Sequence, residues 1–156
     1  MLINRRGKII GDYKKMHLYG DGDDMSSGKK VRIFKTDFAK IGIAVCWDLA
    51  FPEVFREIKA KGAQIVFCPS QWKYELHAHH GSKYEEKHKK RERALLESLI
   101  RSRAFENLFY VALINPILDD KDQINYSAIA SPHKIISEIN DKEGLIAAKI
   151  NLQSLK

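Results

Sequence analysis

One cysteine stands where an apolar segment meets a turn. Cys46 lies in the segment KIGIAVCWDLAFPE, directly after the apolar residues 41–45 and before Trp47 and Asp48. A free cysteine is among the most commonly buried residue types, so packing is the default interpretation. The carboxyl end of a buried strand is also where α/β sheets place ligand crevices. There the N–H groups of Trp47 and Asp48 would lack ladder partners and could face a developing oxyanion, so the position also suits a nucleophile.

A thiol is mostly protonated at neutral pH and needs a base or a nearby positive charge to act as a nucleophile. The segment YKKMHL offers Lys14, Lys15 and His17 for this purpose. In an extended segment side chains alternate, which puts Tyr13, Lys15 and His17 on one face and Lys14 on the other. Most lysines are solubilising surface residues, so the segment by itself leaves the role open.

The second cysteine has a different setting. Cys68 also ends an apolar segment, but a proline follows it in FCPS, and we interpret it as a core or pocket-wall residue. Two cysteines make no disulfide framework, and their scarcity is typical of a reducing compartment.

These residues need strands and helices to position them. Apolar segments bounded by turn residues predict strands, and an apolar stripe at helical spacing predicts a helix. The predicted strands are residues 1–4, 9–16, 31–36, 41–45, 64–68, 109–114, 126–130, 134–139 and 145–150, and the predicted helices are residues 52–61 and 83–107. Helices between strands that look buried predict a layered α/β sheet, in one domain spanning residues 1–156.

Composition limits the class of protein. The chain has 156 residues, of which 44% are hydrophobic and 30% charged, as in a globular domain. No apolar run approaches the roughly 20 residues that span a bilayer, and the N-terminus does not resemble a secretory signal. We therefore expect a cytoplasmic protein without a membrane partner. The net charge of +7 invites a nucleic-acid interpretation, but no binding motif accompanies it, so we expect no nucleic-acid partner.

Four segments, in order along the chain, carry a resemblance to a known family. GIAVCWDLAFPEVFREIKAKGAQIVFCPSQW resembles the nucleophile segment of the nitrilase superfamily, the carbon–nitrogen hydrolases. That segment has a strand, Cys, an Asp two residues on, Phe-Pro-Glu, a helix with KGA, and a second strand leading to Pro and Trp. YKKMHL resembles the lysine segment of the family, RSRAFENLFYVALIN its later helix-strand segment, and ASPHKIISEI its hairpin.

The resemblance implies an αββα sandwich that dimerises through further layers. Cys46 matches the nucleophile that attacks a nitrile or amide carbon, and Lys15 matches the lysine that stabilises the tetrahedral intermediate, with the backbone N–H of Trp47 as co-donor. An ammonium close to a thiolate favours the thiolate and meets negative charge on the reacting atom. The implied course is a covalent acyl- or thioimidate-enzyme, loss of ammonia or amine, and hydrolysis by water, without a metal or organic cofactor.

The chain also departs from the family pattern. Family members carry a general-base glutamate on an early strand well before the lysine segment, and only fourteen residues precede Lys15 here. We therefore expect the C-terminal part of a larger hydrolase, with an incomplete sandwich and impaired activity, since losing a general base costs about 10²–10⁴-fold in rate. Many members carry a second glutamate after the lysine. This loop offers only Asp21, Asp23 and Asp24, of which Asp24 is a candidate pocket residue, with turn solubility as the alternative.

The remaining candidates have structural alternatives. Trp72 follows a strand end and is either a pocket residue or a packing cap. Glu53 and Arg56 are expected to hold the FPE turn through an ion pair. The histidines suggest a metal by count, but without Cys or carboxylates at ligand spacing we expect none. These histidines are His77, His79, His80 and His88.

We predict a hydrolase of carbon–nitrogen bonds other than peptide bonds, acting on an amide, nitrile or N-carbamoyl substrate. It would work as a homo-oligomer or with a companion N-terminal chain. The alternative is a non-catalytic degenerate subunit or a basic-helix interaction module. Thiol reactivity separates the two, because a poised Cys46 reacts faster than free cysteine whereas a packing cysteine is protected.

Overall fold

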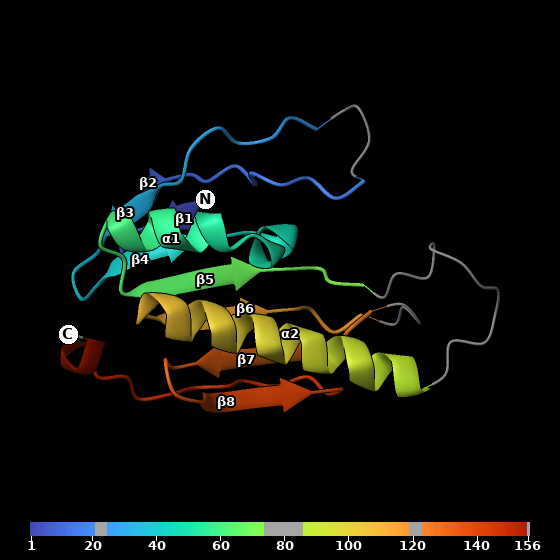
Figure 1. Ribbon diagram of the computed structural model, residues 1–156. Helices are drawn as coiled ribbons and strands as arrows, with labels where there is room; N and C mark the ends of the chain where they lie inside the picture. The colour runs from blue at the N-terminus through green and yellow to red at the C-terminus, as the bar shows by residue number, and fades with distance from the viewer. Residues whose placement is uncertain (21–24, 74–85, 119–122, 156) are drawn as a thin grey trace.

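Six strands form one mixed sheet in the computed structural model, in the order β3-β4-β5-β6-β7-β8 (Figure 1). The structure describes residues 1–20, 25–73, 86–118 and 123–155. The strands of the sheet are β3 (Ile33–Lys35), β4 (Lys40–Ile43), β5 (Ile65–Pro69), β6 (Tyr110–Ile114), β7 (Tyr126–Ala130) and β8 (Ile135–Asn140). Strands β4, β5 and β6 run parallel, and the other neighbours pair antiparallel. This confirms the predicted layered α/β sheet.

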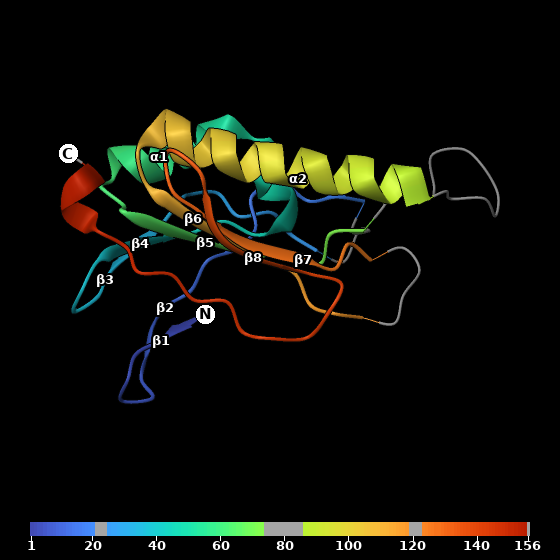
Figure 2. The same ribbon diagram turned by 90° about the horizontal axis from the view of Figure 1, so that it is seen from below.

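Two helices cover one face of the sheet, because parallel neighbours require crossover connections. Helix α1 (Pro52–Ala60) joins β4 to β5, helix α2 (Glu86–Asn107) joins β5 to β6, and both lie on the same side of the strands (Figure 2). Pro52 occupies the first turn of α1, and Gly62 follows its end with φ +86°. The predicted start of the second helix, at residue 83, lies outside the described residues. Within the described ranges, no helix combines the length and apolarity needed to cross a membrane.

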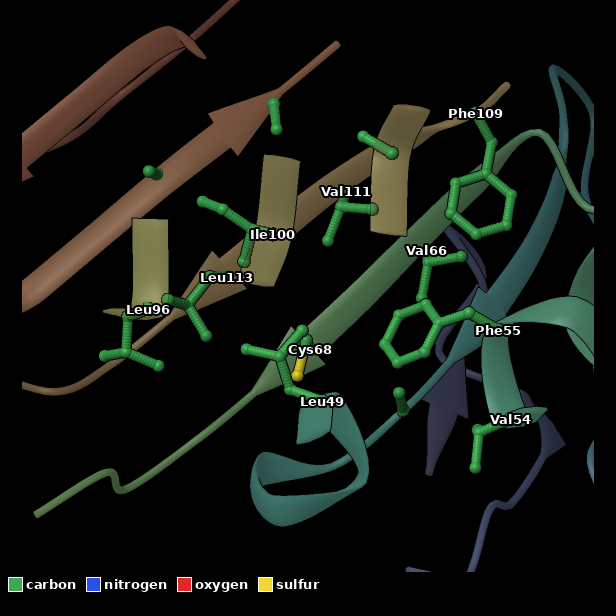
Figure 3. Close-up of a cluster of buried hydrophobic side chains, with 14 of the residues drawn as sticks. Leu49, Val54, Phe55, Val66, Cys68, Leu96, Ile100, Phe109, Val111 and Leu113 are labelled. Carbon is green, nitrogen blue, oxygen red and sulfur yellow. The ribbon is translucent and has the colours of Figure 1, made fainter. Parts of the chain in front are cut away.

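The core lies between this helical layer and the sheet. Side chains of α1 and α2 meet those of β5 and β6 there, as the close-up in Figure 3 shows. Phe55 and Ile58 of α1 and Leu96 and Ile100 of α2 are fully buried. Gly42 lets α1 approach β4, since a Cβ at Gly42 would come within 2.5 Å of an Ile58 methyl group.

The opposite face of the sheet is only partly covered. A two-stranded ribbon, β1 (Leu2–Ile3) with β2 (Ile9–Gly11), lies on that side in Figure 2. The C-terminal segment and its short 3₁₀ helix, η3 (Leu152–Leu155), pack against Ile65 and Tyr110. Phe67 and Ile114 remain 36% and 45% exposed. The described chain therefore provides one helical layer and one sheet, two of the four layers of the predicted αββα sandwich.

Two predicted strands differ from the structure. Residues 145–150 form no strand, and Leu145 is 91% exposed. Their apolar alternation reflects side-chain packing, because the Ile150 side chain packs against the sheet while its backbone forms no strand. The predicted strand 9–16 pairs only as far as Gly11, and beyond it the backbone N–H groups of Met16 and His17 donate to a side chain instead of a ladder.

A matched pair of phenylalanine substitutions tests this core. Phe55 is fully buried and its ring lies 6.4 Å from that of Phe109, so Phe55→Ala should lower the free energy of unfolding by about 3–5 kcal/mol. Phe38, which is 65% exposed in the turn between β3 and β4, is the control, and Phe38→Ala should change it by less than about 0.5 kcal/mol. Urea unfolding of both variants measures the difference. Equal losses would contradict the core assignment.

Candidate active site

Cys46 occupies a left-handed turn just beyond the carboxyl end of β4. Its φ is +50°, a conformation that costs a residue with a Cβ roughly 1–2 kcal/mol. The turn is closed on both sides of Cys46. The Val45 N–H donates to Asp48 Oδ2 at 3.0 Å, and the Asp48 N–H donates to the Val45 carbonyl at 3.1 Å. A 3₁₀ helix, η1 (Cys46–Ala50), begins at the cysteine, which is partly exposed and not in a disulfide.

The two backbone donors expected beside Cys46 are used differently. The Asp48 N–H has no ladder partner, but it donates to the Val45 carbonyl within the turn, so the expectation that it could face an oxyanion is wrong. The Trp47 N–H has no hydrogen-bond partner in the part of the chain that the structure describes. The Trp47 N–H therefore remains available to an oxyanion formed at Cys46.

Asp48 is the residue whose side chain makes the most hydrogen bonds around Cys46 among the described residues. It is fully buried, and its carboxylate accepts four hydrogen bonds and lies beside a ring nitrogen of His17. Oδ1 accepts from the N–H groups of Met16 at 3.1 Å and His17 at 2.8 Å, and lies 3.2 Å from His17 Nδ1. Oδ2 accepts from Val45 and from the Tyr13 hydroxyl at 2.8 Å. One buried side chain thus joins the turn that carries Cys46 to the lysine segment.

The exposure pattern of the lysine segment follows the predicted alternation. Tyr13, Lys15 and His17 are partly buried and Lys14 is exposed, although the segment is extended chain outside any sheet. The Lys15 carbonyl accepts the Gly28 N–H at 2.7 Å. The structure therefore brings the backbone around Lys15 against the turn that carries Cys46.

Helix α2 supports the other side of η1 through a buried arginine. Arg103 is 6% exposed, and its guanidinium donates to the carbonyls of Leu49 at 3.2 Å and Ala50 at 3.5 Å. Glu106 pairs with the same guanidinium at 3.1 Å. These bonds satisfy carbonyls that the short helix leaves without partners. Arg103 had no predicted role, and the only signal for it was its place in the segment RSRAFENLFYVALIN.

Aromatic rings line the turn on the side of Trp47. Its ring lies 4.7 Å from Tyr19 and 5.4 Å from Trp72, measured between centroids. Trp72 is buried in the core cluster, and its N–H donates to Asn115 Oδ1 at 3.0 Å. The His17 ring stacks on Phe51 at 3.6 Å. The Trp72 ring thus packs against the Trp47 ring, and its contact with the site is made through Trp47.

Cys68 lies in β5 and is fully buried, as predicted for a core residue. Burial is the main cause that raises the pKa of its thiol, to about 12, and the Ser70 hydroxyl at 3.6 Å opposes this. Negative charge at Cys46 and at Asp48 raises the pKa further. At neutral pH Cys68 is a protonated, inaccessible thiol.

The expected ion pair between Glu53 and Arg56 is absent. Both residues are described and exposed on α1, and no ion pair joins them in that part of the chain. Both side chains extend into water, where an exposed pair gains little. The FPE turn is instead held by Arg103 and by the Phe51 N–H, which donates to the Asp48 carbonyl at 3.1 Å.

Several candidates cannot be placed. Asp24 and its neighbours Asp21 and Asp23 lie outside the described residues, as do His77, His79 and His80 and the side chain of His88. Among the residues that the structure does describe, no group of three or more His, Cys, Asp or Glu side chains could hold a metal ion.

The whole sequence, residues 1–156, matches the Carbon-nitrogen hydrolase family. The chain belongs to this family. Among curated carbon–nitrogen hydrolases, 2-oxoglutaramate amidase of Bacillus subtilis is 28% identical over 97% of this chain and 55% of its own length. An omega-amidase of Xenopus tropicalis is 26% identical over 96% of this chain and 54% of its own. The chain thus spans about half the length of the curated relatives it matches.

Solved carbon–nitrogen hydrolases share the fold. Nit3 of Saccharomyces cerevisiae, a member of the nitrilase superfamily, superposes with a TM-score of 0.80 at 27% identity, over 97% of this chain and 52% of that one. A carbon–nitrogen hydrolase from Helicobacter pylori gives a TM-score of 0.84 at 24% identity, over 98% and 56%. The recognised family and the incomplete nitrilase-type sandwich are both confirmed.

The two cysteines of this member of the Carbon-nitrogen hydrolase family should differ sharply in their reactivity toward alkylating reagents. Iodoacetamide at neutral pH should label Cys46 in the folded chain and spare Cys68, because Cys68 is fully buried with a pKa of about 12. Peptide mass mapping after labelling measures this. Cys46→Ala should abolish labelling, and Cys68→Ala is the matched control that should leave it. Labelling of Cys68 before the chain unfolds would contradict the placement of the two thiols.

Proposed function

We propose that this chain carries the nucleophilic half of an amidase. Its Cys46 thiolate would attack the carbonyl carbon of a small amide, with Lys15 and the Trp47 N–H as oxyanion donors. The observation that carries the proposal is the turn itself. A partly exposed cysteine at φ +50° stands beside an unpartnered N–H and a lysine segment anchored to the same turn. Amides are favoured over nitriles because most of the similar curated relatives are amidases by name, acting on 2-oxoglutaramate in one case, although one relative is named a probable nitrilase.

The proposed reaction balances as an acyl transfer in two stages. The thiolate forms the C–S bond, and the carbonyl electron pair moves to oxygen, where the Lys15 ammonium and the Trp47 N–H bind it. Collapse of this intermediate breaks the C–N bond, and the nitrogen takes the proton that the Cys46 thiol had given up to a base and leaves as ammonia. Water then attacks the thioester carbonyl, loses a proton to a base, and releases the acid as the C–S bond breaks. No residue of this chain is assigned as that base.

We further propose that a segment of a longer protein, or a companion chain, supplies the remaining layers. The face that carries Phe67 and Ile114 supports this, since both are partly exposed apolar side chains on the sheet. The relatives, twice as long, also leave about half of their length unmatched. The base would come from this missing portion.

A homo-oligomer is proposed as well. Helix α2 carries Phe105, 64% exposed, and Leu95, 46% exposed, on the side away from the sheet. Apolar side chains exposed together on a helix favour contact with another protein surface.

The chain by itself should acylate at Cys46 but should turn over amides only slowly. We expect Cys46 to form a covalent adduct, but steady release of ammonia from short aliphatic amides to run about 10²–10⁴-fold below that of a full-length amidase, because the base is lacking. Ammonia assays and intact mass measure the two steps. Acrylamide suits as a covalent probe, since a Glu→Gln variant of a Nesterenkonia amidase carries its Michael adduct on the active-site cysteine.

Two outcomes would contradict parts of the proposal. Turnover at full rate by the purified chain would show that the base lies within it. Failure of acrylamide to modify Cys46 in a folded sample, with Cys46→Ala as the blank, would overturn the nucleophile assignment. That second result would favour a non-catalytic subunit.

A further inference from the structure

We infer that Asp48 is a positioning residue that fixes Lys15 relative to Cys46, so that breaking its hydrogen bonds slows the thiol through Lys15. This inference rests on the proposed roles of Cys46 and Lys15. Asp48 is placed to act on both, because its carboxylate bonds to the chain on either side of Lys15 and to the residue before Cys46.

The peptide group that follows Lys15 is held at both ends. Its carbonyl, from Lys15, accepts the Gly28 N–H at 2.7 Å, and its N–H, from Met16, donates to Asp48 Oδ1 at 3.1 Å. A peptide plane with both polar groups bonded cannot rotate without breaking one of them. The backbone angle ψ of Lys15 is therefore set, and with it the direction in which the Lys15 side chain leaves the chain.

Gly28 makes this double attachment sterically feasible. A Cβ at Gly28 would lie 2.2 Å from the Lys14 carbonyl oxygen, a distance that no side chain tolerates. The loop that carries Gly28 can therefore approach the lysine segment this closely only with glycine at this position.

Tyr13 anchors the chain on the other side of Lys15. Its hydroxyl donates to Asp48 Oδ2 at 2.8 Å. Burial, and next the charge of Asp48, raise the pKa of Tyr13 above its usual value, so the hydroxyl stays a donor at neutral pH. Lys15 thus lies between two attachment points, Tyr13 before it and Met16 after it, that converge on one carboxylate.

The same carboxylate holds the turn that carries Cys46. Its Oδ2 accepts the Val45 N–H at 3.0 Å, directly before Cys46, and the Asp48 N–H closes the turn from the other side. Asp48 therefore fixes both partners of the proposed Lys15–Cys46 pair in one frame. A purely structural Asp48 would also stabilise the fold, but it would not make the reactivity of Cys46 depend on Lys15.

Asp48→Asn breaks this frame with almost no change in shape. An amide has one oxygen and one NH₂ group, and the NH₂ group must face one of the two sets of donors. On the Oδ2 side it opposes the Val45 N–H, and on the Oδ1 side it opposes the N–H groups of Met16 and His17. Either orientation leaves at least one backbone N–H without its acceptor. Tyr13→Phe is the milder variant, because it keeps the carboxylate and every backbone bond.

The experiment measures the rate of iodoacetamide alkylation of Cys46 against pH in a four-member cycle. Its members are the unmodified chain, Asp48→Asn, Lys15→Met and the double variant. We expect Lys15→Met and Asp48→Asn each to slow the reaction at neutral pH about tenfold and to move its half-maximal pH upward. The double variant should be no slower than Lys15→Met alone, because Asp48 acts through Lys15. Tyr13→Phe should slow it about threefold, only when Lys15 is present.

Protection of Cys68 reports folding in every sample. If Asp48→Asn exposes Cys68, then Tyr13→Phe replaces it in the cycle under the same criteria. Two results would overturn the inference alone. One is a folded Asp48→Asn variant that keeps the pH profile of the unmodified chain. The other is an Asp48→Asn substitution that slows alkylation of Cys46 equally with and without Lys15. An unchanged profile in Lys15→Met overturns the proposed role of Lys15 as well, so the two failures are told apart.

Discussion

The site depends on a single buried carboxylate and the donors that surround it. A buried charge without partners costs several kcal/mol, so the Asp48 side chain stays in the interior only while its donors are in place. Those donors come from two segments that are distant in the sequence, at Tyr13, Met16 and His17 on one side and at Val45 on the other. The energy of burying Asp48 thereby couples two loops that the sheet alone would not bring together.

The other contacts that hold the turn around Cys46 also come from within the chain. Arg103 satisfies the carbonyls at the end of η1, and Asn115 holds the backbone of Trp72, whose ring backs Trp47. The far face of the sheet contributes none of these contacts, although it leaves Phe67 and Ile114 partly exposed. The half of the fold described here therefore holds the turn around Cys46 through contacts made within the chain.

The sequence predicts best what local periodicity controls. The run of apolar residues in β4–β6 and the stripe of α1 repeat over short distances, and the structure confirms them. Prediction fails where a distant partner decides. Residues 12–16 leave the ladder, and the N–H groups of Met16 and His17 donate to Asp48 instead, while residues 145–150 have side-chain contacts but form no strand. The motif points to an Asp two residues after Cys46, yet only the structure shows what its carboxylate binds.

The contrast between the two cysteines shows what the left-handed turn achieves. Along β4 side chains alternate, and Ala44 lies fully buried beneath the helices. A regular extension of the strand would send Cys46 to the same side as Ala44, into the core that holds Cys68. The turn at φ +50° interrupts this alternation and leaves Cys46 partly exposed. Because two hydrogen bonds join Asp48 to Val45, directly before Cys46, the residue that positions the lysine segment also holds the turn that keeps Cys46 from becoming a second core cysteine.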